Sequence, residues 1–373
     1  MHLIPGSWTC VLSSFYCTYE MRGVVAAEGP ATIKEIPIPI PGEGQVVIRV
    51  QCCAVNRLDL LQVSGASPPP RGAGPVLGVE VAGTFVSAGE GCTGDWREGE
   101  TVCALVTGGG YAEFCVASEK TTWPCARLVP TMSLAQLSAI PEAMMTAYQL
   151  LFFVAEAKRG ETVLLHAAAS SIGQALIQMC VRKGIRVLAT TRSLDKRETC
   201  LQLGASECFV VSGSFSAEVL QAAKGGVDAV FCPVGNSYFT ENVASLAIDG
   251  RYILYGTLSG AAEEPGPNAL GKLLAKRISL LPSTLRSRSD AYKAELGARL
   301  AADEECGIGA IIPSKYQIHV DEVLPLERFA DAHAKMSSNS NIGKIVLTVT
   351  ANASAIEFFR AELDTVMKRG GVK

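Results

Sequence analysis

The sequence contains no C-x-x-C pair, although it has 13 cysteines among its 373 residues. Cysteine pairs of that kind are the usual ligands of structural zinc, and a regular even set would instead indicate a disulfide framework. The cysteines here are odd in number, and most stand singly in apolar runs, as Cys180, Cys200 and Cys232 do. Their spacing argues against a structural zinc site and against a disulfide framework. It favours a reducing compartment, in which a buried cysteine acts as a small hydrophobic residue.

The sequence also has no excess of charge of either sign, since 33 basic residues stand against 36 acidic ones, for a formal net charge of -3. A nucleic-acid or membrane partner is therefore not expected. Apolar residues nowhere run for the roughly 18 positions that a membrane-spanning helix needs. Residues 1–20 contain neither Lys nor Arg, which a secretory signal or a transit peptide would need. We expect a cytoplasmic protein in which residues 1–20 form an N-terminal extension.

Hydrophobic residues make up 48% of the chain and charged residues 18%, which excludes a disordered protein and, at this length, favours two folded domains. From Met21 to about residue 122, short apolar runs alternate with glycine and proline. Runs of this length between turn residues predict strands, for example at residues 46–50, 83–87 and 101–106. This part of the chain is therefore expected to be mostly β, as a small barrel.

Strands and helices alternate in the second half of the chain, after an apolar helical stretch at Leu134–Val154. A strand at residues 162–166 leads into a helix at 172–183, whose apolar positions recur every three or four residues. Further strands are predicted at 185–191, 208–211, 227–234, 251–255 and 278–281. This alternation predicts a parallel sheet covered by helices on both faces, which is the doubly wound nucleotide-binding architecture.

The last part of the chain is predicted to contain one helix and a closing strand at residues 344–349. After it, Ile356, Phe359, Leu363, Val366 and Met367 recur at helical spacing and predict an amphipathic C-terminal helix. We expect this helix to dock on its own domain, with an oligomer contact as the alternative.

The first strand-to-helix turn of the predicted sheet reads HAAASSIG, from His166 to Gly173. Only the last glycine of the dinucleotide fingerprint G-x-G-x-x-G remains. Small residues still allow the backbone to approach a pyrophosphate, and the free N–H groups at the start of the helix would hold its charge. In this context the turn favours cofactor binding. His166 ends a buried strand and is expected to be a paired core residue rather than a catalyst.

The second strand of the sheet ends at Thr191, about 20 residues after the turn. An enzyme that uses NAD would place an acidic side chain at this strand end to bind the ribose 2′-hydroxyl. Here Arg192 and Ser193 follow, with Lys196 one turn further on and Asp195 past the strand end. Two cations and a hydroxyl suit a 2′-phosphate, so the sequence favours NADPH over NADH.

Nine stretches match a known family in order along the chain: residues 41–44 (PGEG), 54–62 (AVNRLDLLQ), 77–83 (LGVEVAG), 108–110 (GGG), 140–143 (IPEA), 146–151 (TAYQLL), 254–256 (LYG), 284–288 (TLRSR) and 341–347 (NIGKIVL). With these stretches the chain resembles the zinc-independent quinone oxidoreductases of the medium-chain dehydrogenase/reductase superfamily. The likeness is closest to the tumour-suppressor-inducible branch beside zeta-crystallin. It runs from Met21 to about Val349.

The resemblance implies an α/β protein with a GroES-like β-barrel domain and a doubly wound Rossmann domain, with NADPH between them. The expected boundaries are residues 21–145 together with 285–350 for the GroES-like domain and 146–284 for the Rossmann domain. Residues 351–373 would form a C-terminal helical tail. The resemblance also implies a small-molecule quinone as substrate and a homodimer that pairs through the edges of the Rossmann domains.

The resemblance places Asn56 and Thr146 beside the nicotinamide, and it implies catalytic roles for these two residues and for Ser67. Ser67 stands where relatives have a tyrosine, so we expect a wider acceptor pocket that favours fused-ring quinones over small ones. The cofactor-binding residues that the resemblance implies are Asn56, Thr146, Ser170, Ser171, Ile172, Gly173, Arg192, Ser193, Lys196, Gly235, Tyr255, Gly256 and Asn341.

Zinc-dependent relatives need a Cys, a His in a G-H-E stretch and a third ligand. In this chain the cysteine position is Asn56 and the stretch reads GVE at Gly78, Val79 and Glu80, so no metal is expected. Without a Lewis acid, hydride delivery to an electron-poor acceptor such as a quinone is favoured over alcohol oxidation. An NADPH-dependent enone or enoyl reductase is one alternative. A non-catalytic, crystallin-like NADPH-binding protein, with or without RNA binding, is another.

Overall fold

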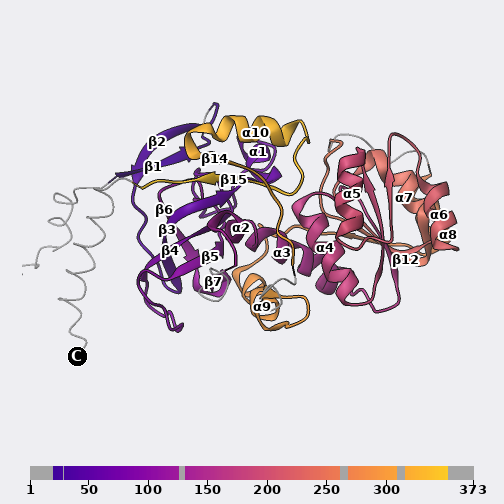
Figure 1. Cartoon of the computed structure of the whole chain (residues 1–373), viewed down its shortest axis with the longest axis horizontal. Coiled ribbons are helices and arrows are strands. Elements are labelled where there is room, and N and C mark those ends of the chain that lie inside the picture. The colour runs from indigo at the N-terminus through magenta and orange to yellow at the C-terminus, as the bar shows by residue number, and fades with distance from the viewer. Residues whose placement is uncertain (1–19, 28, 126–130, 261–267, 309–315, 352–373) are drawn as a thin grey trace, which may run out of the picture.

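The computed structural model describes residues 20–27, 29–125, 131–260, 268–308 and 316–351, which form two bodies side by side (Figure 1). One body is built on a mainly antiparallel sheet with strands from both ends of the chain, and the other on a parallel sheet from its middle. Helix α3 (Pro141–Tyr148) lies between them and continues into a π-helical turn at Gln149–Val154. The predicted C-terminal helix and residues 1–19 lie outside the described residues.

The first body is the predicted barrel. Its seven-stranded sheet runs in the order β14 (Val320–Pro325), β15 (Lys344–Thr348), β3 (Gln45–Ala54), β4 (Glu80–Ala88), β5 (Thr101–Leu105) and β7 (Thr122–Pro124), and β6 (Phe114–Ser118) also pairs with β3. The strands β1 (Glu20–Val25) and β2 (Thr32–Pro37) form a separate antiparallel pair that is joined to this body by two single bridges. The long strand β3 therefore lies at the centre, and its side chains Val46, Ile48 and Val50 are fully buried.

The second body is the predicted doubly wound sheet. All six strands are parallel, in the order β10 (Glu207–Val210), β9 (Arg186–Thr191), β8 (Thr162–Leu165), β11 (Val227–Cys232), β12 (Leu246–Leu254) and β13 (Ser279–Pro282). The chain runs outward from β8 in one direction and then outward from β11 in the other. Ligands of such sheets bind at the carboxyl ends of the strands, where the direction of winding changes.

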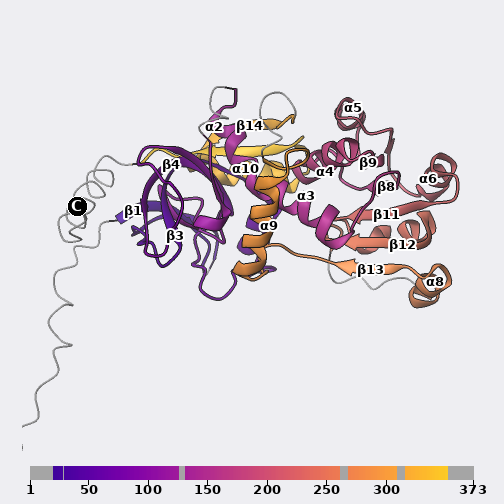
Figure 2. The ribbon, with the colours of Figure 1, turned by 90° about the horizontal axis from the view of Figure 1, so that it is seen from below.

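Helices cover both faces of the parallel sheet because neighbouring residues of each strand point to opposite sides. Leu165 and Phe231 pack in one core with α3 and with α4 (Ser171–Arg182), whereas Leu164 and Val230 pack in another with α6 (Ser216–Ala223) and α7 (Phe239–Ser245). The remaining helices are α1 (Arg57–Val63), α2 (Leu134–Ser138), α5 (Leu194–Gln202), α8 (Ala269–Lys276), α9 (Asp290–Ala302) and α10 (Phe329–Ser337). Figure 2 shows β13 and α8 at the outer edge of this body.

The apolar stretch Leu134–Val154 is long and apolar enough to cross a membrane by composition, but 78% of it is buried inside the structure. It contains α2 and α3, and α3 packs against α4. It is therefore typical of a core helix, whose apolar surface contacts other parts of the same chain.

The predicted strands and helices of both bodies are confirmed, most within one or two residues. The strand expected at residues 251–255 is longer, because Leu246 already pairs with Val227 before a register shift. Strand β14, which the sequence did not predict, adds to the edge of the barrel sheet beside β15. The predicted boundary at residue 145 falls inside the helix α3, and the exact domain limits stay a prediction.

Candidate cofactor and acceptor site

The turn from β8 into α4 is tight and lined by small residues. Ala167 adopts a φ of 49°, in the left-handed region that glycine usually occupies. Ser170 caps α4, because its hydroxyl accepts a hydrogen bond of 3.1 Å from the Gly173 amide. A Cβ on Gly173 would lie 2.5 Å from the carbonyl oxygen of Ala168. Only glycine therefore lets the helix pack so closely on the turn, which is the role of the last glycine of the fingerprint.

A loop from the barrel body lies against this turn. The Gly343 amide donates to the Ala169 carbonyl at 2.9 Å, and Gly343 pairs with Ser170 in a single parallel bridge. The Asn341 side chain donates to the Gly343 carbonyl at 2.8 Å and so fixes the shape of the loop. The structure thereby gathers five predicted cofactor residues at the start of α4: Ser170, Ser171, Ile172, Gly173 and Asn341.

Three cations converge beyond the end of β9. Lys196 donates to the Asn339 carbonyl at 2.5 Å, and Arg57 donates to the Asn339 side chain at 2.5 Å. Burial lowers the pKa of both Lys196 and Arg57, and the neighbouring charge of Arg192 lowers them further. Ser193 begins α5 beside them. Like charges held together in this way favour an anionic ligand with several oxygens, such as a phosphate.

Sequence reasoning missed Arg57. This residue comes from helix α1 of the barrel body, 135 positions before Arg192 along the chain. The only available signal was its place directly after Asn56, and nothing in the local pattern distinguishes it from a solvated helix start.

The ends of β11 and β12 approach each other closely. Gly235 has a φ of 94°, and a Cβ on Gly256 would lie 2.8 Å from the Pro233 carbonyl oxygen. The Tyr255 amide donates to the Cys232 carbonyl at 3.1 Å. Burial raises the pKa of the Tyr255 hydroxyl, with smaller contributions from charges nearby that include Glu142 of α3. The predicted residues Gly235, Tyr255 and Gly256 thus lie together, next to the helix of Thr146.

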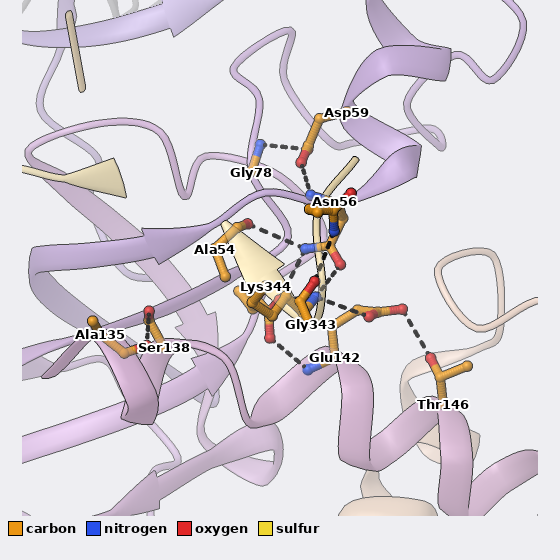
Figure 3. A network of polar contacts seen from close by, with 12 residues as sticks. Ala54, Asn56, Asp59, Gly78, Ala135, Ser138, Glu142, Thr146, Gly343 and Lys344 are labelled. Carbon is orange, nitrogen blue, oxygen red and sulfur yellow. Dashed lines mark hydrogen bonds and ion pairs between the residues drawn. The ribbon is translucent and has the colours of Figure 1, made fainter. Parts of the chain in front are cut away.

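A buried ammonium group stands where the two bodies meet. Lys344 is 2% exposed and donates to Glu80 at 2.5 Å, to Glu142 at 3.4 Å and to the side-chain oxygen of Asn56 (Figure 3). Burial by itself would lower the pKa of Lys344, but the two carboxylates outweigh it and raise the pKa. The pKa of Glu80 is raised by its own burial and next by the charge of Glu142. The network therefore keeps a fixed positive charge between two acidic groups.

Asn56 and Thr146 both belong to this network. The Asn56 amide donates to Glu80 at 2.9 Å and to the Ala54 carbonyl at 3.2 Å. Its donors and its oxygen are then engaged by the protein, so Asn56 can position Lys344 and Glu80 but has no free donor for a ligand. The Thr146 hydroxyl donates to Glu142 at 2.9 Å (Figure 3). Its oxygen keeps lone pairs that could accept a hydrogen bond from an amide such as that of nicotinamide.

Asp59 extends the network into the barrel body. Its carboxylate accepts hydrogen bonds from the Asn56 amide at 2.8 Å, the Gly78 amide at 3.1 Å and the Tyr111 hydroxyl at 3.1 Å. Burial nevertheless raises the pKa of Asp59 to about 6, with these hydrogen bonds and Lys344 acting in the opposite direction. The side chain is thus a buried acid that changes charge within a physiological range of pH.

We expect the contribution of Asp59 to the stability of the folded protein to fall as the pH rises from about 4 to about 6. The pKa of Asp59 is about 6 in the folded chain against an ordinary value of 3.8, so the unfolded chain loses the proton first. The contribution is fully present below about pH 4 and is lost by about pH 6, for a total of about 3 kcal/mol. Urea unfolding of wild type and Asp59→Asn between these values checks this. Asp331→Asn, at an exposed surface pair, is the control.

A difference in unfolding free energy between wild type and Asp59→Asn that stays constant over the whole interval would contradict this prediction. It would mean that Asp59 keeps the same charge in both the folded and the unfolded chain.

Two residues from the sequence analysis are not part of the Lys344 network. Ser67 follows α1, where its amide donates to the Leu61 carbonyl at 3.1 Å, and among the described residues its side chain makes no hydrogen bond to Asn56 or Thr146. Its catalytic role stays a prediction. His166 is fully buried and paired through both ring nitrogens, to Thr190 at 2.7 Å and Asn242 at 2.6 Å. Burial lowers its pKa to about 4, so it is a core residue as predicted.

Within the described part of the chain, no group of three or more His, Cys, Asp or Glu side chains is placed to hold a metal ion. Asn56, which the resemblance aligns with a zinc-binding cysteine, contacts the Lys344 ammonium, and so does Glu80. A positive charge of the protein itself therefore lies beside both residues.

Two family models match the chain. The model described as "Alcohol dehydrogenase GroES-like domain" matches residues 42–130, and the model described as "Zinc-binding dehydrogenase" matches residues 171–301. The first falls within the barrel body, and the second covers most of the parallel sheet and α9. Both matches agree with the fold.

The curated and solved relatives are similar over most of the chain. The quinone oxidoreductase of Lama guanicoe is 30% identical over 338 residues, which cover 88% of this chain and 97% of that protein. A mycobacterial protein solved in complex with NADPH has a TM-score of 0.77 at 27% identity, covering 88% of this chain and 99% of that one. An NAD-dependent alcohol dehydrogenase has a TM-score of 0.75 at 27% identity, covering 88% and 100%.

Proposed function

The chain belongs to the medium-chain dehydrogenase/reductase superfamily, with quinone oxidoreductases among its relatives, and is an NAD(P)H-dependent oxidoreductase; we propose that it reduces quinones with NADPH, without zinc. The observation that carries the proposal is the set of groups that the two bodies bring together near the carboxyl ends of the parallel strands. This set comprises the cations Lys196, Arg192 and Arg57, the turn at Gly173 and the Lys344 network, which adjoins the cations because Arg57 directly follows Asn56.

The residues present fit NADPH. The tight turn at Gly173 and the close approach of Gly256 to Pro233 allow backbone contact with an extended ligand. The helix start at Ser170 suits the pyrophosphate, and the three cations suit the 2′-phosphate. The relatives alone do not decide between the cofactors, since one binds NADPH and another is NAD-dependent. The cation cluster supports NADPH.

NADPH supplies a hydride when it is bound, and the chain has to orient it and keep the acceptor close. The Thr146 hydroxyl is oriented by the hydrogen bond that it donates to Glu142, and the remaining lone pairs of its oxygen can accept a hydrogen bond from the nicotinamide amide. Lys344 donates to Glu142 and Glu80 and holds them in place, and Asn56 donates a further hydrogen bond to Glu80. These residues act by positioning, which suits an acceptor that is already electron-poor.

The experiment is a survey of acceptors with purified protein. We expect acceptor-dependent NADPH oxidation with 1,4-benzoquinone and with 9,10-phenanthrenequinone, and the fused-ring quinone should be the faster of the two. Enones and enoyl thioesters test the alternative reductase activity, and faster turnover of either class would replace the quinone assignment. Tight NADPH binding without oxidation in the presence of any acceptor would instead favour a non-catalytic binding protein.

We expect no stoichiometric zinc in the active protein. At the positions of zinc ligands this chain has Asn56 and Val79, and the ammonium of Lys344 would repel a second cation there. Elemental analysis of chelator-washed protein, beside its NADPH-dependent quinone activity, is the measurement. One equivalent of zinc whose removal abolishes activity and whose return restores it would overturn the zinc-independent assignment.

We also propose a homodimer that pairs through β13 and α8. Among the described residues, β13 pairs with β12 alone, which leaves its other edge open. Leu280 on this strand is 42% exposed, and Leu270 and Leu274 on α8 are about four-fifths exposed. An open strand edge beside apolar side chains favours pairing with a second copy around a two-fold axis. Sedimentation equilibrium at micromolar concentration should give twice the chain mass; a monomer would contradict the proposal.

A cytoplasmic location of the protein stays a prediction from its sequence.

A further inference from the structure

One arginine reaches from the parallel-sheet body into the barrel body and remains only partly paired. Arg286 follows β13, and its Nε donates to the Thr107 carbonyl at 2.8 Å. Its two terminal amino groups, Nη1 and Nη2, are buried and have no hydrogen-bond partner among the residues that the structure describes. Buried donors are nearly always paired in folded proteins, so a guanidinium with two unpaired amino groups needs a specific explanation.

This guanidinium lies next to the residues that we assign to the nicotinamide. Gln149 stands about one helical turn after Thr146, and its amide donates to the Ser283 hydroxyl at 2.8 Å and to the Thr284 carbonyl at 3.1 Å. These two bonds hold the segment of Arg286 against the helix of Thr146. On the barrel side, the charge of Asp59 acts on Arg286 and opposes the lowering of its pKa by burial. Arg286 therefore stands between the Thr146 helix and the Asn56–Asp59 turn.

The surroundings of Nη1 and Nη2 leave both groups able to donate hydrogen bonds to a further oxygen. A Cβ on Gly108 would lie 3.5 Å from Nη2, so a glycine borders the guanidinium on that side. Lys293 lies close enough to interact with Arg286, since the pKa of Lys293 is lowered by burial and, to a smaller extent, by the charge of Arg286. The Asp59 carboxylate accepts hydrogen bonds from Asn56, Gly78 and Tyr111, and its charge acts on Arg286 without a hydrogen bond to the guanidinium. An oxygen from outside the described part of the chain is therefore the partner that fits this geometry.

We propose that Arg286 binds the acceptor, donating from its terminal amino groups to the acceptor's carbonyl oxygen, a role that rests on the proposed function. Hydride transfer from NADPH to a quinone gives NADP⁺ and a hydroquinone monoanion, which takes up one proton to give the hydroquinone. Negative charge thus develops on oxygen during the transfer. A fixed guanidinium beside that oxygen is arranged to stabilise it more strongly in the transition state than in the ground state.

The first test compares Arg286→Met with Arg288→Met. Arg288 is two residues away and exposed, with its guanidinium over the ring of Tyr292, so it is a matched control. We expect Arg286→Met to lower kcat/KM for 9,10-phenanthrenequinone by about 10- to 100-fold, the value of one charge-assisted hydrogen bond. Arg286→Lys should recover part of the loss. The kcat/KM of Arg288→Met should stay within about twofold of wild type. The dissociation constant for NADPH should also stay within about twofold of wild type in all three variants.

A structural role for Arg286 would give a different pattern. Arg286→Met would then shift the urea midpoint of unfolding and weaken NADPH and quinone alike, and this outcome would overturn the proposal. An unchanged kcat/KM with a normal midpoint would also overturn it, since Nη1 and Nη2 would then be hydrated groups without a function.

A second test does not depend on turnover. We expect 4-nitrophenolate, which presents an anionic oxygen, to bind the NADP⁺ complex of wild type about tenfold more tightly than that of Arg286→Met, whereas nitrobenzene should not distinguish them. If wild type reduces no quinone but shows this difference, the proposed function fails and the oxygen site at Arg286 stands. If wild type reduces quinones and the difference is missing, the proposed function stands and the role of Arg286 is wrong.

Discussion

Lys344→Met is expected to lower the free energy of unfolding by about 3–5 kcal/mol, because it removes a buried ammonium that contacts the carboxylates of Glu80 and Glu142 at the junction of the two bodies. Glu80 is fully buried and would be left without a counter-charge. The side-chain oxygen of Asn56 would at the same time lose the hydrogen bond that Lys344 donates to it. The measurement is urea unfolding at neutral pH, followed by a probe in each body so that separate transitions are seen.

Two further variants make this prediction specific. Lys335 also binds two carboxylates, Asp321 and Glu322, but it is about one-third exposed, so Lys335→Met should cost below about 1 kcal/mol. Adding Glu80→Gln to Lys344→Met should recover part of the loss, because the uncompensated charge is removed and the Asn56 amide can turn to pair with the new side chain. Equal losses for Lys344→Met and Lys335→Met would show that the buried network is no stronger than a surface pair.

Lys196→Ala is expected to raise the KM for NADPH by about tenfold or more and to leave the KM for NADH nearly unchanged. A charge-assisted hydrogen bond to a phosphate contributes about 1.5–3 kcal/mol, and only NADPH has a 2′-phosphate to receive it. Arg57→Met should have the same selectivity, because its guanidinium is held beside Lys196 by the shared residue Asn339. Steady-state kinetics with both cofactors and one quinone are the measurement.

The exposed Lys158 lies on the same body and away from the cation cluster, so Lys158→Ala serves as the charge-matched control. A loss of affinity that is the same for NADPH and NADH in Lys196→Ala would refute the assignment of the 2′-phosphate to this cluster. It would place Lys196 on a part of the cofactor that both nucleotides share.

The fold could be predicted from the sequence because its signals are local. The residues of β8 and β9 are mostly apolar or β-branched, and the helix α4 between them repeats the apolar positions Ala175, Leu176, Met179 and Cys180, all of which are buried. Such periodicity indicates the element and its buried face without knowledge of the neighbours. Strand β14 was missed because its residues are half-exposed, and it forms only by pairing with β15.

The candidate site could be predicted where a single turn defines it. Gly173 is required by the packing of α4 on Ala168, and Lys196 follows directly from its place after the second strand. The residues that complete the site were not visible in this way. Arg57, Glu142 and Arg286 lie in ordinary helical or loop sequences. Only the folded structure shows that Arg57 and Glu142 have long-range partners and that the terminal amino groups of Arg286 have none among the described residues.

The sequence by itself determined the two-body architecture, the position of the tight turn before α4 and the cationic strand end, since each depends on residues close together along the chain. The tertiary structure alone decided which charges meet. Lys344 contacts Glu80 across 264 positions and Asn56 across 288, and Arg286 contacts Thr107 across 179. The physical reason is that the energy of a buried charge depends on every group within a few ångströms of it, and those groups are brought there by folding rather than by their order in the chain.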